Sequence, residues 1–350
     1  MINPEPMSTR FTELVGVDYP VVQEGLGPYR SVSLPAAVSN AGGLGTLCIP
    51  GLTEGTETGA RHLREFIEEL CALTDKPFAV NVPVGTADDG EVLPFSEAYV
   101  KAVVDAVQDP EIARRLRAIT TSAGPPGVVR KIIADSGLVH IHKVGGTRQA
   151  LRAQRDGVDA VVASGYEAGG HTHSRPVHTF ILVPSVVEAL DIPVILAGGA
   201  RDGRSLAATL AFGADAVAMG TRFVAARENT DWHPAYAEAI IAASEGDDVI
   251  FQAIYGPSRA LPSTGIKELA ELVVRGDMDV HELTAWKDSR LIGAMRDGEL
   301  DRGLLPAGQI SGAIKEWITV ADFVPAVVRE AREIIDSLHA RFGSASLPNV

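Results

Sequence analysis

Residues 193–223 read PVILAGGARDGRSLAATLAFGADAVAMGTRF, and this stretch decides the fold. Two short apolar runs, Val194–Ala197 and Ala216–Met219, flank a segment, Gly203–Phe212, whose apolar residues recur at helical spacing. Both runs are almost continuously apolar, which is typical of parallel strands covered on both faces. We therefore expect a strand, a helix and a second strand parallel to the first.

The same alternation of apolar runs and helical segments extends back to the N-terminus, with Ala60–Thr74 as a clear helical segment. Eight strands in alternation with helices favour a closed α/β structure, the (β/α)8 or TIM barrel, and an open doubly wound sheet is the alternative. The eight expected strands are Pro20–Glu24, Leu44–Ile49, Phe78–Val82, Ala118–Thr121, Val139–Val144, Ala160–Ser164, Val194–Ala197 and Ala216–Met219.

The pattern changes after the eighth strand. Residues 227–304 have the spacing of helices without strands, including His233–Ser244 and Gly265–Arg275. We expect residues 1–226 to form the barrel and residues 227–304 a helical lid that binds substrate over its mouth. In the final segment, 305–350, the helix Val320–Phe342 is expected to dock back on the barrel.

Composition narrows the class of protein. The net charge of −14 is opposite in sign to what binding to nucleic acid or to an anionic membrane surface requires. The apolar runs are far shorter than the roughly 20 residues that span a bilayer, and residues 1–10 lack the apolar core of a signal peptide. Only two cysteines, Cys48 and Cys71, are present. We expect a reduced, cytoplasmic enzyme with a small-molecule substrate, as a monomer or a homodimer.

Function in a barrel is carried by residues that follow the carboxyl ends of the strands. The seventh strand is followed by Gly198 and Gly199, and the eighth by Gly220 and Thr221. Such turns after the last two strands are where barrel enzymes bind a phosphate through backbone N–H groups and helix N-termini. The sixth strand is followed by Glu167-Ala-Gly-Gly-His171, which places an imidazole at the barrel mouth.

Two alternatives of other classes remain open from these residues. His171 and His173, like His140 and His142, form His-x-His pairs, a spacing that can bind Zn²⁺ in a metal-dependent hydrolase. No carboxylate or bridging lysine pattern completes such a site, and we assign no metal ligands. The second alternative is a non-catalytic barrel that binds a phosphorylated ligand. We expect Glu167 to orient its loop by hydrogen bonding.

Five segments together resemble the nitronate monooxygenase (2-nitropropane dioxygenase-like) family of FMN-dependent barrels. They are Pro20–Gln23, Ala36–Gly45, Glu167–His171, Ala197–Arg204 and Met219–Phe223. The resemblance covers most of the chain up to about Arg227. FMN-dependent enoyl-acyl-carrier-protein reductases and NADH:quinone reductases share the pattern, so it identifies the superfamily better than the reaction.

The resemblance implies FMN as the cofactor and His171 as the catalytic imidazole. Lys143 would lie near the N1–C2 edge of the flavin ring, where a cation stabilises the anionic reduced form. The other cofactor-binding positions that it implies are Gly25, Leu26 and Gly27 against the ring, Ser164, Gly170 and Ala197 beside them, and Gly198, Gly199, Gly220 and Thr221 at the phosphate.

The resemblance also implies the reaction, oxidation of an alkyl nitronate with O₂. The alternative is a flavin reductase that takes NAD(P)H as co-substrate and reduces an enoyl thioester or a quinone. The chain departs from the family pattern at Glu24, Leu26, His173 and Arg201. These positions lie where a substrate would enter, so the departures bear on the substrate more than on the cofactor.

Overall fold

The barrel expected from the sequence is present in the computed structural model, which describes residues 3–51, 55–87 and 89–343. Its eight strands are all parallel to their neighbours and correspond one by one to the eight expected strands. They are β1 (Val21–Gln23), β2 (Gly45–Cys48), β3 (Phe78–Val84), β4 (Leu116–Ala123), β5 (Val139–Val144), β6 (Ala160–Ser164), β8 (Val194–Ala197) and β9 (Ala216–Met219).

The strands follow one another around a ring in the order β1-β9-β8-β6-β5-β4-β3-β2. A parallel bridge between Val22 and Leu44 joins the two ends of this order. Two hydrogen bonds support the closure, from the Gln23 N–H to the Leu44 carbonyl (3.0 Å) and from the Leu44 N–H to the Val21 carbonyl (2.9 Å). The sheet is therefore a closed barrel rather than the open doubly wound alternative.

Small and β-branched side chains fill the barrel interior, in the alternation that the strand period imposes. Val22, Ile141 and Ile195 belong to this cluster with several alanines, and all are buried. Phe11 and Val15 of the helix α1 (Arg10–Val15) belong to the same cluster. Since α1 precedes β1, it caps the amino-terminal end of the barrel, and the carboxyl end remains for a functional site.

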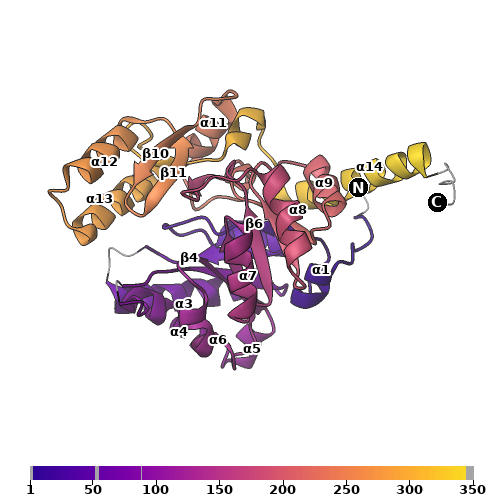
Figure 1. Cartoon of the computed structure of the whole chain (residues 1–350), viewed down its shortest axis with the longest axis horizontal. Helices are drawn as coiled ribbons and strands as arrows, with labels where there is room; N and C mark the ends of the chain where they lie inside the picture. Colours follow the sequence, from indigo (N-terminus) through magenta and orange to yellow (C-terminus); the bar gives the residue numbers. More distant parts are fainter. Residues whose placement is uncertain (1–2, 52–54, 88, 344–350) are drawn as a thin grey trace.

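Helices cover the outside of the barrel, and Figure 1 shows α3, α4, α6, α7, α8 and α9 around the strands. Their apolar faces pack against the outward residues of the strands in two further clusters. The helices from the first strand to just after the last are α2 (Ser33–Asn40), α3 (Thr56–Leu73), α4 (Pro94–Ala106), α5 (Pro110–Ala113), α6 (Gly127–Ile133), α7 (Thr147–Arg155), α8 (Thr179–Ala189), α9 (Gly203–Ala211) and α10 (Thr221–Val224).

Residues 227–304 differ from the expectation of helices alone, which is wrong for the middle of this segment. Two antiparallel strands, β10 (Val249–Ala253) and β11 (Gly256–Leu261), form a hairpin there. The rest consists of α11 (Pro234–Ala242), α12 (Thr264–Arg275), α13 (Val280–Ile292) and a π-helical turn, η1 (Gly293–Asp297). We call residues 227–304 the lid; Figure 1 shows its elements in orange at one end of the barrel.

β10 and β11 are separated by only two residues, so the apolar run Val249–Ala253 was a local signal for the hairpin that the interpretation as helices overlooked. β11 also pairs with β12 (Leu305–Pro306) and with a two-residue strand, β7 (Gly170–His171), between β6 and α8. A local apolar pattern carries no information about such partners. The lid sheet therefore includes the loop that carries the candidate histidine.

The C-terminal part contains a 3₁₀ turn, η2 (Gln309–Ala313), and the long helix α14 (Val320–Phe342). Val327 and Glu330 of α14 lie against Gly203 at the start of α9. The last residues of the C-terminal segment expected from the sequence, 344–350, lie outside the described residues. No helix in the described part of the chain is long and apolar enough to cross a bilayer.

Candidate active site

A cavity opens at the carboxyl ends of the barrel strands, where the sequence predicted the site. Its lining includes Gly25 after β1, Asn81 of β3, Thr120 of β4 and Lys143 of β5. The alternation along β5 puts Ile141 and Lys143 on the barrel side. Lys143 is partly exposed and forms an ion pair with Glu24, the residue that follows β1. A cation and its counter-ion thus stand together at the mouth.

The segment after β1 lies close against the ends of the neighbouring strands. A Cβ atom on Gly25 would lie 2.7 Å from the Asn81 Cβ, and one on Gly27 would overlap the Cys48 sulfur. Neither position therefore admits a side chain without a shift of its neighbours. Burial raises the pKa of the Cys48 thiol to about 12, so this thiol stays protonated at neutral pH.

Two glycines end the neighbouring strands β8 and β9. Ala197 pairs with Ala218 in the β8–β9 register, which brings Gly199 and Gly220 to the same edge of the barrel. Neither of their N–H groups donates to an acceptor among residues 3–51, 55–87 and 89–343. The Gly199 φ of +77° favours glycine. A Cβ on Gly199 would meet nothing nearer than 3.8 Å, and one on Gly220 nothing nearer than 3.6 Å.

Two neighbouring N–H groups without an acceptor, at turns that are not crowded, are a suitable environment for an anion. Thr221 was also predicted at this place. Its Oγ1 accepts a hydrogen bond from the Gly308 N–H at 2.9 Å. Gly308 in turn lies beside Gly169 and the Glu167 carbonyl. The segment around residue 308 therefore bridges the loops after β6 and β9, a role that no local sequence signal indicated.

His171 lies on the lid sheet and not on a barrel strand. It is the register partner of Ser258 in β11, and the adjacent Thr172 N–H donates to the Pro257 carbonyl at 2.9 Å. The imidazole centroid is 6.3 Å from the ring centroid of Tyr255, at the tip of the β10–β11 hairpin. The Tyr255 hydroxyl is held 3.0 Å from Thr284 Oγ1. Tyr255 and Thr284 were not predicted, because only the hairpin brings them to His171.

The electrostatics at His171 favour its neutral form. Its side chain reaches solvent, yet the surrounding lid and loop atoms displace much of the water around it. This desolvation, together with the positive charges of Lys287 and Lys143, lowers the pKa of His171 to about 4. At neutral pH the imidazole thus has one nitrogen that donates and one that accepts a hydrogen bond or a proton.

The loop before His171 is held by Glu167, as the sequence predicted. The Glu167 carboxylate accepts hydrogen bonds from the Thr179 N–H (3.1 Å) and hydroxyl (2.8 Å), and His178 Nδ1 lies 3.3 Å away. Thr179 is the first residue of α8, so the carboxylate also lies at a helix N-terminus, where a negative charge is stabilised. Glu167 therefore orients the loop.

The other histidine pair lies on the outer face of β5. His140 Nε2 and His142 Nδ1 are each 2.8 Å from Thr121 Oγ1, and both rings are buried. Burial lowers the pKa of His140 to about 3 and that of His142 to about 4. In the described part of the chain, no group of three or more His, Cys, Asp and Glu is gathered closely enough to hold a metal ion.

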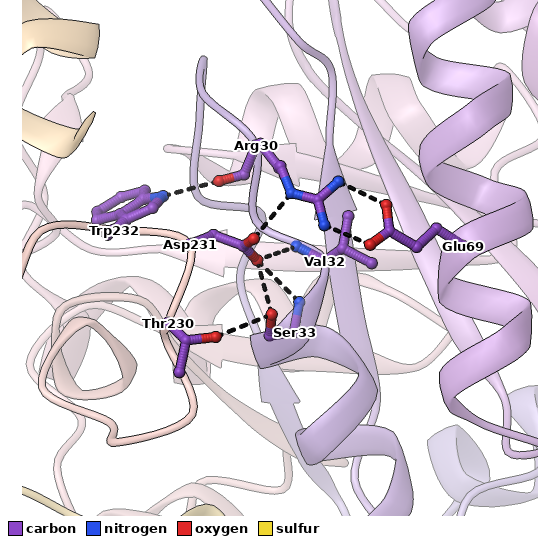
Figure 2. Close-up of polar contacts among 7 residues, drawn as sticks. All are labelled: Arg30, Val32, Ser33, Glu69, Thr230, Asp231 and Trp232. Atoms are coloured by element: carbon purple, nitrogen blue, oxygen red, sulfur yellow. Dashed lines mark hydrogen bonds and ion pairs between the residues drawn. The ribbon is translucent and has the colours of Figure 1, made fainter.

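A polar network fixes the segment that follows the glycines after β1 (Figure 2). Asp231 accepts the N–H groups of Val32 (2.8 Å) and Ser33 (2.9 Å) at the start of α2, and Arg30 Nε at 2.8 Å. The Arg30 guanidinium also binds Glu69 of α3. These bonds lower the pKa of Asp231. The network ties the barrel mouth to the first residues of the lid.

The structure places the predicted residues at the barrel cavity, at the ends of the strands β6 and β8, and, for His171, on the lid sheet. Gly25 and Lys143 line the cavity, and Leu26 lies beside Gly220. Ser164 is the register partner of Ala197, so both stand at the strand ends next to Gly198 and Gly199. His171 and the glycine turns lie outside the cavity lining. Asn81, which donates to Thr120 Oγ1 at 2.9 Å, was missed; its polarity within the apolar run Phe78–Val84 was the available signal.

Comparison with known proteins identifies the family. The sequence profile of nitronate monooxygenases matches residues 8–330. A Rhodococcus jostii protein named (3aS,4S,5R,7aS)-5-hydroxy-7a-methyl-1-oxo-octahydro-1H-indene-4-carboxyl-CoA dehydrogenase is 31% identical, covering 95% of this chain and 98% of its own. A probable nitronate monooxygenase of Staphylococcus saprophyticus is 30% identical, covering 94% of this chain and 99% of its own.

Solved structures agree with this assignment. FabK from Thermotoga maritima matches with a TM-score of 0.82 and 33% identity, over 96% of this chain and 100% of that chain. A nitroalkane oxidase from Streptomyces ansochromogenes matches with a TM-score of 0.76 and 26% identity, over 94% of this chain and 100% of that chain. The likeness covers the barrel and the lid together.

Proposed function

The chain belongs to the nitronate monooxygenase family of oxidoreductases, and on that premise we propose that it is an FMN-dependent enzyme that oxidises alkyl nitronates with O₂. The observation that carries the proposal is His171, an imidazole that the pairing of β7 with β11 of the lid holds at the barrel mouth. A neutral imidazole at this place can donate a hydrogen bond from one ring nitrogen and accept a hydrogen bond or a proton at the other.

Backbone N–H groups at the mouth support the binding of a flavin phosphate. The N–H groups of Gly199 and Gly220 point from adjacent strand ends and have no acceptor in the described ranges. A Cβ at either position would make only ordinary van der Waals contacts, the nearest at 3.6 Å. These observations support a phosphate held by Gly198, Gly199, Gly220 and the backbone of Thr221, with Ala197, Ser164 and Gly170 beside the cofactor.

Lys143 and the segment 25–27 fit the ring end of the same group. The ammonium stands at the carboxyl end of β5, in the cavity that Gly25 also lines. There it stabilises negative charge, while Glu24 reduces its net effect. When bound, FMN supplies the two-electron redox chemistry that no side chain of the cavity provides.

The protein contributes binding and proton handling. In the proposed reaction His171 donates a hydrogen bond to a nitro oxygen of the nitronate. If a neutral nitroalkane binds instead, the imidazole takes the proton from the carbon next to the nitro group. Lys287, 2.9 Å from Asp288, keeps positive charge near this imidazole and so opposes its protonation. We also propose that residues 1–226 bind the cofactor and that the lid selects the substrate.

A second candidate is a flavin enzyme that acts on a thioester of coenzyme A, either as a dehydrogenase or as a reductase that takes NAD(P)H. The favouring observation is the Rhodococcus jostii relative, whose name states a carboxyl-CoA substrate and which matches nearly the whole chain. The carbon next to a thioester carbonyl is acidic for the same reason as the carbon next to a nitro group, so the role of His171 carries over.

The two candidates are separated by anaerobic reduction of the purified yellow protein. A nitronate, NADH, NADPH and an acyl-CoA are each mixed with separate samples, and the loss of flavin absorbance is followed. Bleaching by the nitronate without bleaching by the other three supports the first candidate. Rapid bleaching by NAD(P)H or by acyl-CoA supports the second. A colourless protein that does not take up FMN contradicts both.

A further inference from the structure

Arg259 is a buried cation at the junction of lid and barrel. It lies in β11 with 2% of its side chain exposed, and its Nη1 forms an ion pair with Asp248, which is 5% exposed. Its Nε and Nη2 both donate to the carbonyl of Tyr166, at 3.2 and 3.0 Å. The guanidinium carbon lies 4.9 Å from the Tyr166 ring centroid. All three guanidinium nitrogens therefore have partners, and the group also stacks on an aromatic ring.

The same residue also contacts the far end of the loop that carries His171. In the β7–β11 register, Arg259 pairs with Gly170, and the next pair is Ser258 with His171. The backbone of Arg259 thus aligns the end of the loop, while its side chain holds the carbonyl of Tyr166 at the start. One lid residue consequently fixes both ends of the segment 166–170.

We propose that Arg259 is a positioning residue that sets the place of the His171 imidazole, so that the lid, and not the barrel alone, determines the catalytic geometry. The inference rests on the role proposed above for His171. Arg259 acts through the loop: its side chain bonds to Tyr166 and Asp248, and it is not among the described residues that line the cavity.

Only arginine satisfies this environment. Its planar fork supplies two N–H groups to one carbonyl and a third to a carboxylate, and its flat face stacks on the tyrosine ring. A lysine in the same place reaches Asp248 or Tyr166 with a single ammonium and cannot do both at fixed geometry. Arg259→Lys therefore keeps the buried charge and its counter-ion but releases the start of the loop.

The test compares Arg259→Lys with the wild-type holoenzyme. We expect kcat to fall by about 10- to 100-fold, as for a catalytic group displaced by about 1 Å, with little change in KM or in bound flavin. A looser loop also exposes the imidazole to water, so the acid limb of the pH–kcat profile moves to higher pH. An NMR titration of the His171 ring protons should show the same upward shift of its pKa, independently of turnover.

The matched control is Arg290→Lys. Arg290 also stacks on an aromatic ring, with its guanidinium carbon 5.1 Å from the Trp286 centroid, and it forms an ion pair with Glu268, which also belongs to the lid. Wild-type kcat and an unmoved acid limb are expected for Arg290→Lys. An equal loss in both variants would identify a general effect of lid stability and overturn the inference.

Asp248→Asn serves as a second variant should Arg259→Lys fail to fold, since the amide keeps one acceptor oxygen for Nη1. It should change kcat and the acid limb in the same direction by a smaller factor. Wild-type values in whichever of the two variants folds would overturn the inference. His171→Ala is measured in parallel: if it keeps full turnover, the function proposed for His171 fails first. If it is inactive while Arg259→Lys behaves as wild type, only the positioning role fails.

Discussion

Lys143 of β5 and Glu24, which follows β1, form an ion pair across the mouth of the barrel. Glu24 also hydrogen-bonds through its N–H to the carbonyl of Met219, at 3.0 Å, so its backbone continues the β1–β9 ladder. The carboxylate is thus fixed beside the one side-chain cation that lines the cavity in the described chain. It must reduce the positive potential that Lys143 offers to a ligand.

The first prediction concerns this pair. Glu24→Gln removes the counter-charge, leaves Lys143 unbalanced and should make the bound flavin easier to reduce, because the reduced form carries the negative charge. The flavin midpoint potential, measured by dye-coupled titration, should rise in Glu24→Gln and fall in Lys143→Met. An unchanged potential in both variants would place the flavin ring away from this pair.

The second prediction concerns His171. His171→Ala should keep its flavin, because His171 belongs to the lid sheet and is not among the residues that we assign to the cofactor. Turnover should fall by about 10²- to 10⁴-fold, the usual contribution of a positioned acid or base. Flavin absorbance per mole of protein and kcat are measured on the same preparation. Full activity in this variant would remove His171 from the mechanism.

The phosphate assignment gives the third prediction. Gly199→Val should weaken FMN retention, because the branched side chain would crowd the space beside the N–H groups that we assign to the phosphate. Backbone strain is separated from this effect by Gly137→Val. Gly137 has a φ of +78°, open space around it, and a place before β5 at the other end of the barrel. Equal flavin content in both variants, after dialysis, would refute the phosphate assignment.

A fourth prediction tests the network in Figure 2. Asp231→Ala removes the acceptor of two N–H groups at the start of α2 and one partner of Arg30. The free energy of unfolding in urea should fall by about 2 kcal/mol, the combined scale of a lost helix cap and a broken partly buried hydrogen-bond set. Asp297→Ala breaks a solvent-exposed pair with Arg296 and should leave the midpoint unchanged. Equal urea midpoints for Asp231→Ala and the wild type would contradict the role given to Asp231.

The fifth prediction concerns acid stability. Burial lowers the pKa of His140 to about 3 and of His142 to about 4 from an ordinary 6.5. The unfolded chain therefore binds protons that the native state excludes, and stability present above pH 6.5 is lost as the pH falls toward 4. The loss is on the order of 3 kcal/mol for each ring.

This pH dependence is checked by urea unfolding at several pH values. His140→Gln should flatten the slope of unfolding free energy between pH 6.5 and 4, whatever its stability at pH 7. His281→Gln, at an exposed position, is the control and should leave the slope as in the wild type. A wild-type slope in His140→Gln would show that the buried pair does not govern acid unfolding.

Most of the barrel could be predicted from the sequence because its strands are continuous apolar runs, such as Val194–Ala197, that can be recognised locally. Each of the eight expected strands corresponds to an observed one, and α14 has the expected bounds. The hairpin of β10 and β11 was not predicted. The remote pairings of β11 with β7 and β12, which build the lid sheet, have no local signal in the sequence.

By itself, then, the sequence determined the order of strands and glycine turns, and hence that Gly199, Gly220 and Lys143 meet at one end of the barrel. That follows because parallel strands end at the same edge. Only the tertiary structure decided that Glu24 neutralises Lys143 and that His171 is paired with Ser258 of the lid. Both relationships join residues more than 80 positions apart, and such contacts depend on how the whole chain packs rather than on any local pattern.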